Sequence, residues 1–201
     1  MVDRPYHHGN VRGAVLTHAL ALIAEEGADK LSVRGVARRA GVSHTAVGKE
    51  FGGLQGLLAA CATQVHHRLG RALGEASADP SDPLTSFRRM GAAYVRFAAE
   101  HPAWMQLMAH PTVLAAEEPG LLTARRAPYD LLVGAIESCM QAGVIRRDAP
   151  TNVALHVWSA VHGFASLRSA GTLIPLQLDE ASADELLSQL FLGLRPDEGQ
   201  R

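Results

Sequence analysis

The sequence predicts an all-α protein of about nine helices, arranged as an N-terminal three-helix unit and a larger C-terminal helical part. Apolar residues recur at spacings of three and four, which is typical of the buried face of a helix, whereas the period-two alternation of strands is absent. Small polar residues and prolines stand where these helices begin, and glycines stand where they end. The 201 residues, of which 47% are hydrophobic and 19% charged, suffice for one or two domains with a core.

Three short helices are expected within the first 51 residues. The first spans about 10–26, and Gly27 ends it. Ser32 and Ser43 are good N-cap residues for the second and third helices, and Gly41 supplies the turn between them. Two short helices joined by a glycine turn form the helix-turn-helix layout.

A long helix over about 54–73 follows, and the small, polar and proline-containing stretch 74–83 is interpreted as a connection. The chain is therefore divided into 1–53 and 54–201, with the helix of about 54–73 joining the two domains. The later helices are expected at 83–100, from 102 as a short helix, and at 120–142, 150–170 and 179–194, with 110–120 broken by Pro111 and Pro119.

The helix-turn-helix layout favours DNA binding, although an αα-hairpin that merely packs has the same layout. One helix braces across the phosphates, and the other lies in the major groove with its N-terminal side chains on base edges. Ser43, His44 and Thr45 open the third helix and can each donate or accept hydrogen bonds. Ser32 and Arg34 open the second helix, where backbone N–H groups and a cation favour phosphate.

The segment YHHGNVRGAVLTHALALIAEEGADKLSVRGVARRAGVSHTAVGKEF resembles the N-terminal domain of TetR-family transcriptional regulators almost throughout. HPAWMQLM (101–108) and VWSAVHGFASL (157–167) resemble the ligand-binding part of one TetR subgroup, in which a Trp is followed by His-Gly. The residues that carry the N-terminal resemblance are Ala19, Gly27, Leu31, Ser32, Val33, Val36, Ala37, Ala40, Gly41, Val42, Ser43 and Phe51.

The resemblance implies an all-helical homodimer with a DNA-binding domain and a C-terminal ligand-binding and dimerisation domain. Its partners would be a double-stranded DNA operator and a small-molecule effector, whose binding moves the two DNA-binding domains apart and releases the operator. The protein is then expected to be a ligand-responsive transcriptional regulator, a repressor, that works in the cytoplasm.

Three positions depart from the family pattern at the third helix. The family usually has Tyr where this chain has Gly48, His or Tyr in place of Glu50, and Lys in place of Leu54. Those family residues commonly hold phosphates, so two hypotheses stay open: an altered contact set, or a small-molecule binding protein on the same scaffold with weak or lost DNA binding. In the first hypothesis the compensating cations are Lys49, Arg34 and Arg38.

The C-terminal part is rich in Met and aromatic residues, which favours an apolar pocket for a hydrophobic or aromatic molecule. Trp158 and His162 are four residues apart and therefore share a helix face. Ordinary core packing is the alternative for each of these side chains. The candidate lining residues are Tyr94, Phe97, Trp104, Met108, Tyr129, Trp158 and His162.

The helices at about 150–170 and 179–194 are the candidate dimerisation helices. The first carries a stripe of small and polar residues beside an apolar stripe, and the second has a broad leucine-rich face. Two such helices from each of two subunits would make a four-helix seam. Alternatively, both stripes stay inside the monomer.

Other classes of protein find little support. GxSxG, Walker, GxGxxG, HxxxH and HExxH motifs are missing, so no enzyme, metal site or cofactor is expected. Two cysteines without a CxxC pair, and an N-terminus without an apolar signal region, fit the cytoplasm. The uncharged run 149–167 contains His and Asn, so a buried helix is expected there and no membrane span. The net charge is −1, with a small excess of cations in the first 51 residues.

Overall fold

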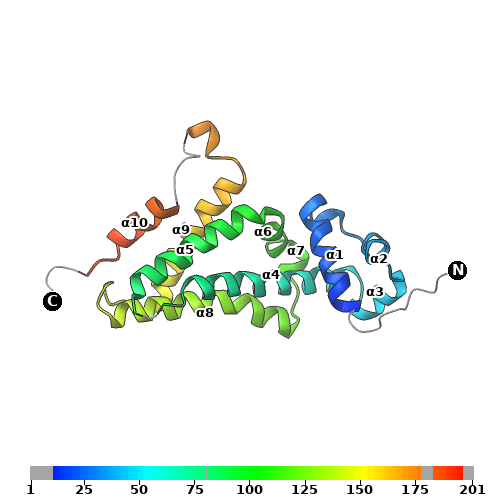
Figure 1. Cartoon of the computed structure of the whole chain (residues 1–201), viewed down its shortest axis with the longest axis horizontal. Helices are drawn as coiled ribbons and strands as arrows, with labels where there is room; N and C mark the ends of the chain where they lie inside the picture. Colours follow the sequence, from blue (N-terminus) through cyan, green and yellow to red (C-terminus); the bar gives the residue numbers. More distant parts are fainter. Residues whose placement is uncertain (1–10, 80, 178–182, 197–201) are drawn as a thin grey trace. The chain divides into compact units, whose positions relative to one another are not determined.

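The computed structural model describes residues 11–79, 81–177 and 183–196. Within these ranges the protein forms ten α-helices, two short 3₁₀ helices and no strand, so the predicted all-α class is confirmed (Figure 1). The described residues form two compact units. The first holds the described residues up to Val65 together with Ala103–Leu122, and the second holds the described residues of 66–102 and those from Thr123 onward.

The first unit begins with a three-helix head, which is defined here as α1 to α3 (residues 11–51) and lies at the blue end of the colour scale in Figure 1. It continues into the start of α4 and contains two short helices from the middle of the chain. Its elements are α1 (Val11–Glu26), η1 (Ala28–Lys30), α2 (Val33–Ala40), α3 (His44–Phe51), the first part of α4 (Leu54–Ala76), α6 (Pro102–Met108), α7 (Pro111–Leu114) and the start of α8 (Pro119–Gln141).

Side-chain caps define the starts of α2 and α3. The Ser32 hydroxyl accepts a hydrogen bond from the Gly35 amide, and the Ser43 hydroxyl accepts one from the Ala46 amide, each at 3.1 Å. Gly41 ends α2 in the left-handed conformation, with φ 68°, which glycine adopts without strain. Both predicted N-caps and the predicted glycine turn are therefore confirmed.

The core of the first unit is built around α1, which buries one apolar face. Trp104 from α6 is buried, and its indole N–H donates to the Leu20 carbonyl of α1 at 3.2 Å. Because an indole has only this one donor, the contact fixes the ring. The largest fully buried side chains of this core are Val15, Ile23, Val36, Val47, Leu57, Cys61, Val65, Leu107, Val113 and Leu121.

The second unit holds the rest of α4 and α8, together with α5 (Pro83–Glu100), α9 (Pro150–Ser169), η2 (Ile174–Leu176) and α10 (Ala183–Leu192). Asp82 caps α5 by accepting the Thr85 amide at 3.0 Å, and this hydrogen bond lowers the pKa of the Asp82 carboxyl. The Phe87 and Phe191 rings meet edge to face with centroids 5.0 Å apart, which packs α10 onto α5.

One detail differs from the expected elements. Residues 110–120 contain the short helix α7, because Pro111 occupies the first turn, where its missing N–H costs nothing. The ninth expected helix is described from Ala183 as α10, and positions 178–182, which include its expected start, lie outside the described residues. No helix in the described ranges is both long and apolar enough to cross a membrane.

Candidate functional site

The start of α3 presents polar side chains to solvent. Val47 and Phe51 are buried and hold α3 in the head, while His44 and Thr45 on its first turn are exposed. Lys49 is exposed one turn further along. The arrangement leaves the first-turn side chains of α3 open to hydrogen bonding with base edges.

The start of α2 lies beside a polar cavity of about 400 Å³ that is lined by residues of α1, η1 and α2, among them Lys30, Ser32 and Arg38. Arg34 is exposed on the first turn of α2. The neighbouring Arg39 is already engaged, because its guanidinium donates to both Glu25 oxygens at 2.5 and 2.6 Å. Those hydrogen bonds hold the pKa of the Glu25 carboxyl below its usual value.

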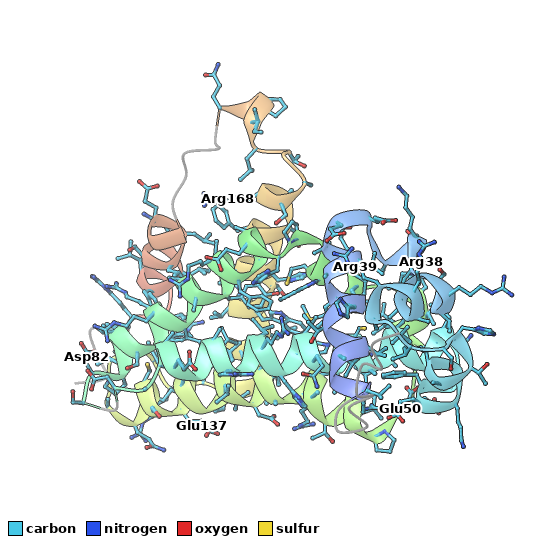
Figure 2. All side chains as sticks on the ribbon, turned by 45° about the vertical axis from the view of Figure 1, so that its right-hand side comes forward. Arg38, Arg39, Glu50, Asp82, Glu137 and Arg168 are labelled. Atoms are coloured by element: carbon cyan, nitrogen blue, oxygen red, sulfur yellow. The ribbon has the colours of Figure 1, made fainter. Side chains whose placement is uncertain are left out.

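The three positions that depart from the family pattern lie at the other end of α3 or just beyond it. A Cβ atom added to Gly48 would have no neighbouring atom within 4 Å outside its own helix backbone, so a side chain has room there. Leu54 is 40% exposed. Glu50 accepts a hydrogen bond from the Arg12 guanidinium at 3.1 Å, and that guanidinium lies 4.8 Å from the centre of the Phe51 ring. Figure 2 shows Glu50 well separated from Arg38 and Arg39, which lie near the other end of the head. The Arg12 contact joins residues 38 positions apart, so helix periodicity could not reveal it.

Four of the predicted pocket residues meet in the second unit. The Tyr94 hydroxyl of α5 lies 2.7 Å from Nδ1 of His162 on α9. Trp158 is one turn earlier on α9, with its ring centre 6.3 Å from that of His162 and 6.0 Å from that of Tyr129 on α8. Trp158 is 45% exposed, so the cluster opens to solvent. It offers aromatic surface together with hydroxyl and imidazole groups.

The other three predicted pocket residues have different surroundings. Phe97 is buried, and its ring centre lies 4.9 Å from that of His101 in an edge-to-face contact. Trp104 and Met108 belong to the first unit, where the Trp104 indole is bonded to the Leu20 carbonyl. The structure therefore groups Tyr94 with Trp158 and its neighbours, and gives Trp104 a packing role against α1.

A buried histidine is not apparent from the sequence. His66 on α4 is 8% exposed, and neither of its ring nitrogens has a hydrogen-bond partner among the described residues. Burial, with the nearby charges of Arg125 and His67, lowers its pKa to about 4. It lines an open groove of about 640 Å³ between α4 and α8. The adjacent pair of histidines is visible in the sequence, but which one is buried depends on the packing of α4 against α8.

Apolar side chains remain exposed on the two candidate dimerisation helices. On α9, Leu155 is 57% exposed and Leu167 is 47% exposed. On α10, Leu192 is 49% exposed. Together with the buried face of α9, Leu155 and Leu167 give this helix apolar positions on more than one side.

The capped helix-turn-helix with an exposed polar first turn in an all-α chain is typical of helix-turn-helix transcriptional regulators. Within this class, the family described as bacterial regulatory proteins, tetR family, matches residues 15–61. The family described as Tetracyclin repressor-like, C-terminal domain, matches residues 87–190. The chain belongs to the TetR family of transcriptional regulators.

Solved structures share the fold. A protein with unknown function from Rhodococcus sp. RHA1 is 33% identical, with 96% of this chain and 99% of that chain covered and a TM-score of 0.81. The TetR-family regulator PfmR from Thermus thermophilus is 20% identical, with 92% and 95% covered and a TM-score of 0.64. A TetR-family regulator from Marinobacter aquaeolei VT8 is 17% identical, with 92% and 95% covered and a TM-score of 0.67. A search of curated proteins finds no match.

Proposed function

We propose that this protein is a ligand-responsive repressor, which binds operator DNA as a homodimer and releases it on binding a small hydrophobic or aromatic molecule. The observation that carries the proposal is the capped start of α3, where His44 and Thr45 are exposed while Val47 and Phe51 anchor the helix. A helix held on one face and polar at its exposed first turn suits entry into the major groove.

The contacts to DNA divide into base reading and phosphate binding. Ser43, His44 and Thr45 face base edges, although the Ser43 hydroxyl also serves as the cap of α3. The phosphate contacts come from the residues that open α2, with one cation of α3; these are Ser32, Arg34 and Lys49. In this proposal residues 1–53 act as the DNA-binding domain and 54–201 as the effector and dimer domain.

The effector binds at the aromatic cluster of α5, α8 and α9. The rings of Tyr129 and Trp158 provide apolar surface, and the Tyr94–His162 hydrogen bond provides one donor and one acceptor that a ligand can exchange. A hydrophobic or aromatic molecule with one polar group fits this composition. Dimerisation covers the exposed leucines of α9 and α10, namely Leu155, Leu167 and Leu192.

The test is an anisotropy titration of the protein against its own upstream intergenic DNA, with an unrelated duplex alongside. We expect tighter binding to the upstream DNA, and His44→Ala should weaken it about tenfold because a base contact is lost. His67→Ala is the matched control, because His67 is exposed on α4 outside the head. Equal, weak binding to both duplexes, unchanged by His44→Ala, would argue against the proposal.

A second candidate is a small-molecule binding protein on the same scaffold with weak DNA binding. The acidic Glu50 and the exposed Leu54 favour it, because both stand where the family usually places phosphate-binding residues. Gly48→Tyr combined with Leu54→Lys should strengthen DNA binding and steepen its salt dependence by about one unit of slope for the added cation. An unchanged slope would mean that these positions do not face phosphate.

A further inference from the structure

The contact between Arg12 and Glu50 joins the first turn of α1 to the last turn of α3. The guanidinium Nη1 lies 3.1 Å from Glu50 Oε1, and the two side chains are 53% and 42% exposed. A second contact holds the same guanidinium over the Phe51 ring, whose side chain is buried in the head. Two contacts therefore hold the Arg12 guanidinium, and only one of them, the contact with Glu50, is an ion pair.

The ion pair contributes little to the stability of the head. An exposed pair of this kind is screened by salt and loses side-chain entropy, so its removal typically shifts Tm by less than about 4 °C in a chain of this size. The Phe51 contact remains when the carboxylate is removed, so Arg12 stays at this edge of the head. The pair is weak enough for another anion to compete with Glu50.

The length of α3 places the Arg12–Glu50 pair near the sugar-phosphate backbone of the DNA when α3 lies in the major groove. Eight residues, His44–Phe51, span about 12 Å at 1.5 Å per residue. The major groove is also about 12 Å wide. When the first turn of α3 reaches base edges, its last turn approaches the sugar-phosphate backbone, and Arg12 lies beside it.

We propose that Glu50 competes with a DNA phosphate for Arg12 and thereby holds operator affinity below what the head can reach. In the free protein the guanidinium bonds to the carboxylate. On DNA it can bond a phosphate oxygen instead, but Glu50 then loses its partner and stands beside the polyanion. Arg12 is thus a phosphate-binding residue that Glu50 engages in the free protein. The contact with Glu50 must break before Arg12 can bind a phosphate, and this lowers the DNA affinity that Arg12 adds. The inference rests on the proposed DNA binding.

The experiment measures binding of the upstream duplex at several salt concentrations for the wild type, Glu50→Gln, Arg12→Gln and the double variant. Glu50→Gln should raise affinity severalfold and steepen the slope of log K against log salt by about 0.9, the contribution of one phosphate contact. Arg12→Gln alone should change affinity less than about twofold, because Glu50 already occupies it. The double variant should lose the whole gain of Glu50→Gln.

Asp130→Asn is the matched control for net charge. Asp130 is also an exposed acid in an ion pair with an arginine, Arg126 at 3.2 Å, but it lies on α8 in the second unit. A gain equal to that of Glu50→Gln would overturn the competition, since net charge alone would explain it. A gain that survives in the double variant would also overturn it, since Glu50 would then act by repelling phosphate without Arg12.

The two proposals fail in different ways. If the wild type binds the upstream duplex specifically and Glu50→Gln changes neither affinity nor slope, the competition is wrong and the DNA-binding function stands. If neither the wild type nor any variant distinguishes the upstream duplex from an unrelated one, the function fails and the competition fails with it. Thermal unfolding shows that each variant is folded before it is titrated.

Discussion

The Tyr94 hydroxyl of α5 lies 2.7 Å from Nδ1 of His162 on α9 and links the two helices that carry most of the candidate effector site. If the hydroxyl donates, the imidazole keeps its proton on Nε2 and can offer it to a ligand. Burial raises the pKa of Tyr94 to about 12, so the phenol stays neutral and able to donate over the physiological range.

Replacing Tyr94 by Phe tests this link. Tyr94→Phe should lower the free energy of unfolding by about 1 kcal/mol near neutral pH, because one hydrogen bond is lost. The raised pKa means that the folded state holds the phenolic proton more tightly than the unfolded state does. Stability linked to Tyr94 is therefore complete below about pH 10 and is lost as the pH rises toward 12. Chemical denaturation from pH 9 to 12 should show this loss in the wild type and less of it in Tyr94→Phe; parallel curves would contradict the assignment.

His66 should make the protein sensitive to mild acid. Its pKa is lowered to about 4 in the folded state, first by burial, so the unfolded state binds the proton more tightly. Stability is fully present above about pH 6.5 and falls as the pH drops toward 4, by up to about 3 kcal/mol. His66→Leu removes this titration and also the two unpartnered nitrogens. The variant should therefore lose less stability than the wild type between pH 7.5 and 5 in urea unfolding, whereas an equal loss would mean that His66 does not titrate as described.

Two glycines of the first unit should respond to alanine in opposite directions. A Cβ at Gly56 would lie 1.8 Å from the Phe51 carbonyl oxygen, so the backbone joining α3 to α4 must shift, and Gly56→Ala should cost about 1–3 kcal/mol or more. A Cβ at Gly48 meets nothing within 4 Å, so Gly48→Ala should stabilise α3 by up to about 1 kcal/mol. Thermal unfolding measures both. Similar effects at the two positions would show that the α3–α4 joint is not tight.

The cap of α3 can be separated from its contact with DNA. Ser43→Ala removes the acceptor for the Ala46 amide and should cost about 1 kcal/mol, with weaker DNA binding as the first turn frays. Ser43→Asp keeps an acceptor and therefore the stability, but it places a negative charge where phosphates approach, so it should weaken DNA binding further. If Ser43→Asp binds DNA as well as the wild type does, the start of α3 does not face the duplex.

The local signals of the sequence predict the helix starts well. Ser32 and Ser43 both cap the helices that they are expected to open, because capping depends only on residues three positions apart. Pro111 is interpreted from the sequence as a breaker but opens α7 instead, since a proline has both roles and only the chain around it decides.

The candidate site is harder to predict where it depends on tertiary packing. Tyr94 and His162 lie 68 positions apart in the sequence and contact each other in the fold. Both belong to the predicted pocket residues, a set that the family resemblance supports. The same set includes Trp104, and its hydrogen bond to the Leu20 carbonyl of α1 has no counterpart in the sequence pattern. Neither the Arg12–Glu50 pair nor the burial of His66 leaves a local signal in the sequence.

The two ion pairs within the described head, Arg12–Glu50 and Arg39–Glu25, lie toward opposite ends of α1 and engage two of its six Lys and Arg side chains. If the head binds DNA as proposed, each cation engaged in an ion pair is one fewer for phosphate neutralisation, so the two pairs lower its affinity for random DNA. Chromosomal DNA offers about 10⁶–10⁹ competing sites, so weak retention there keeps more molecules available to the operator. A modest number of copies per cell would then be enough to keep the regulated promoter occupied. In the described part of the head, the cations outside ion pairs are Lys30, Arg34, Arg38 and Lys49.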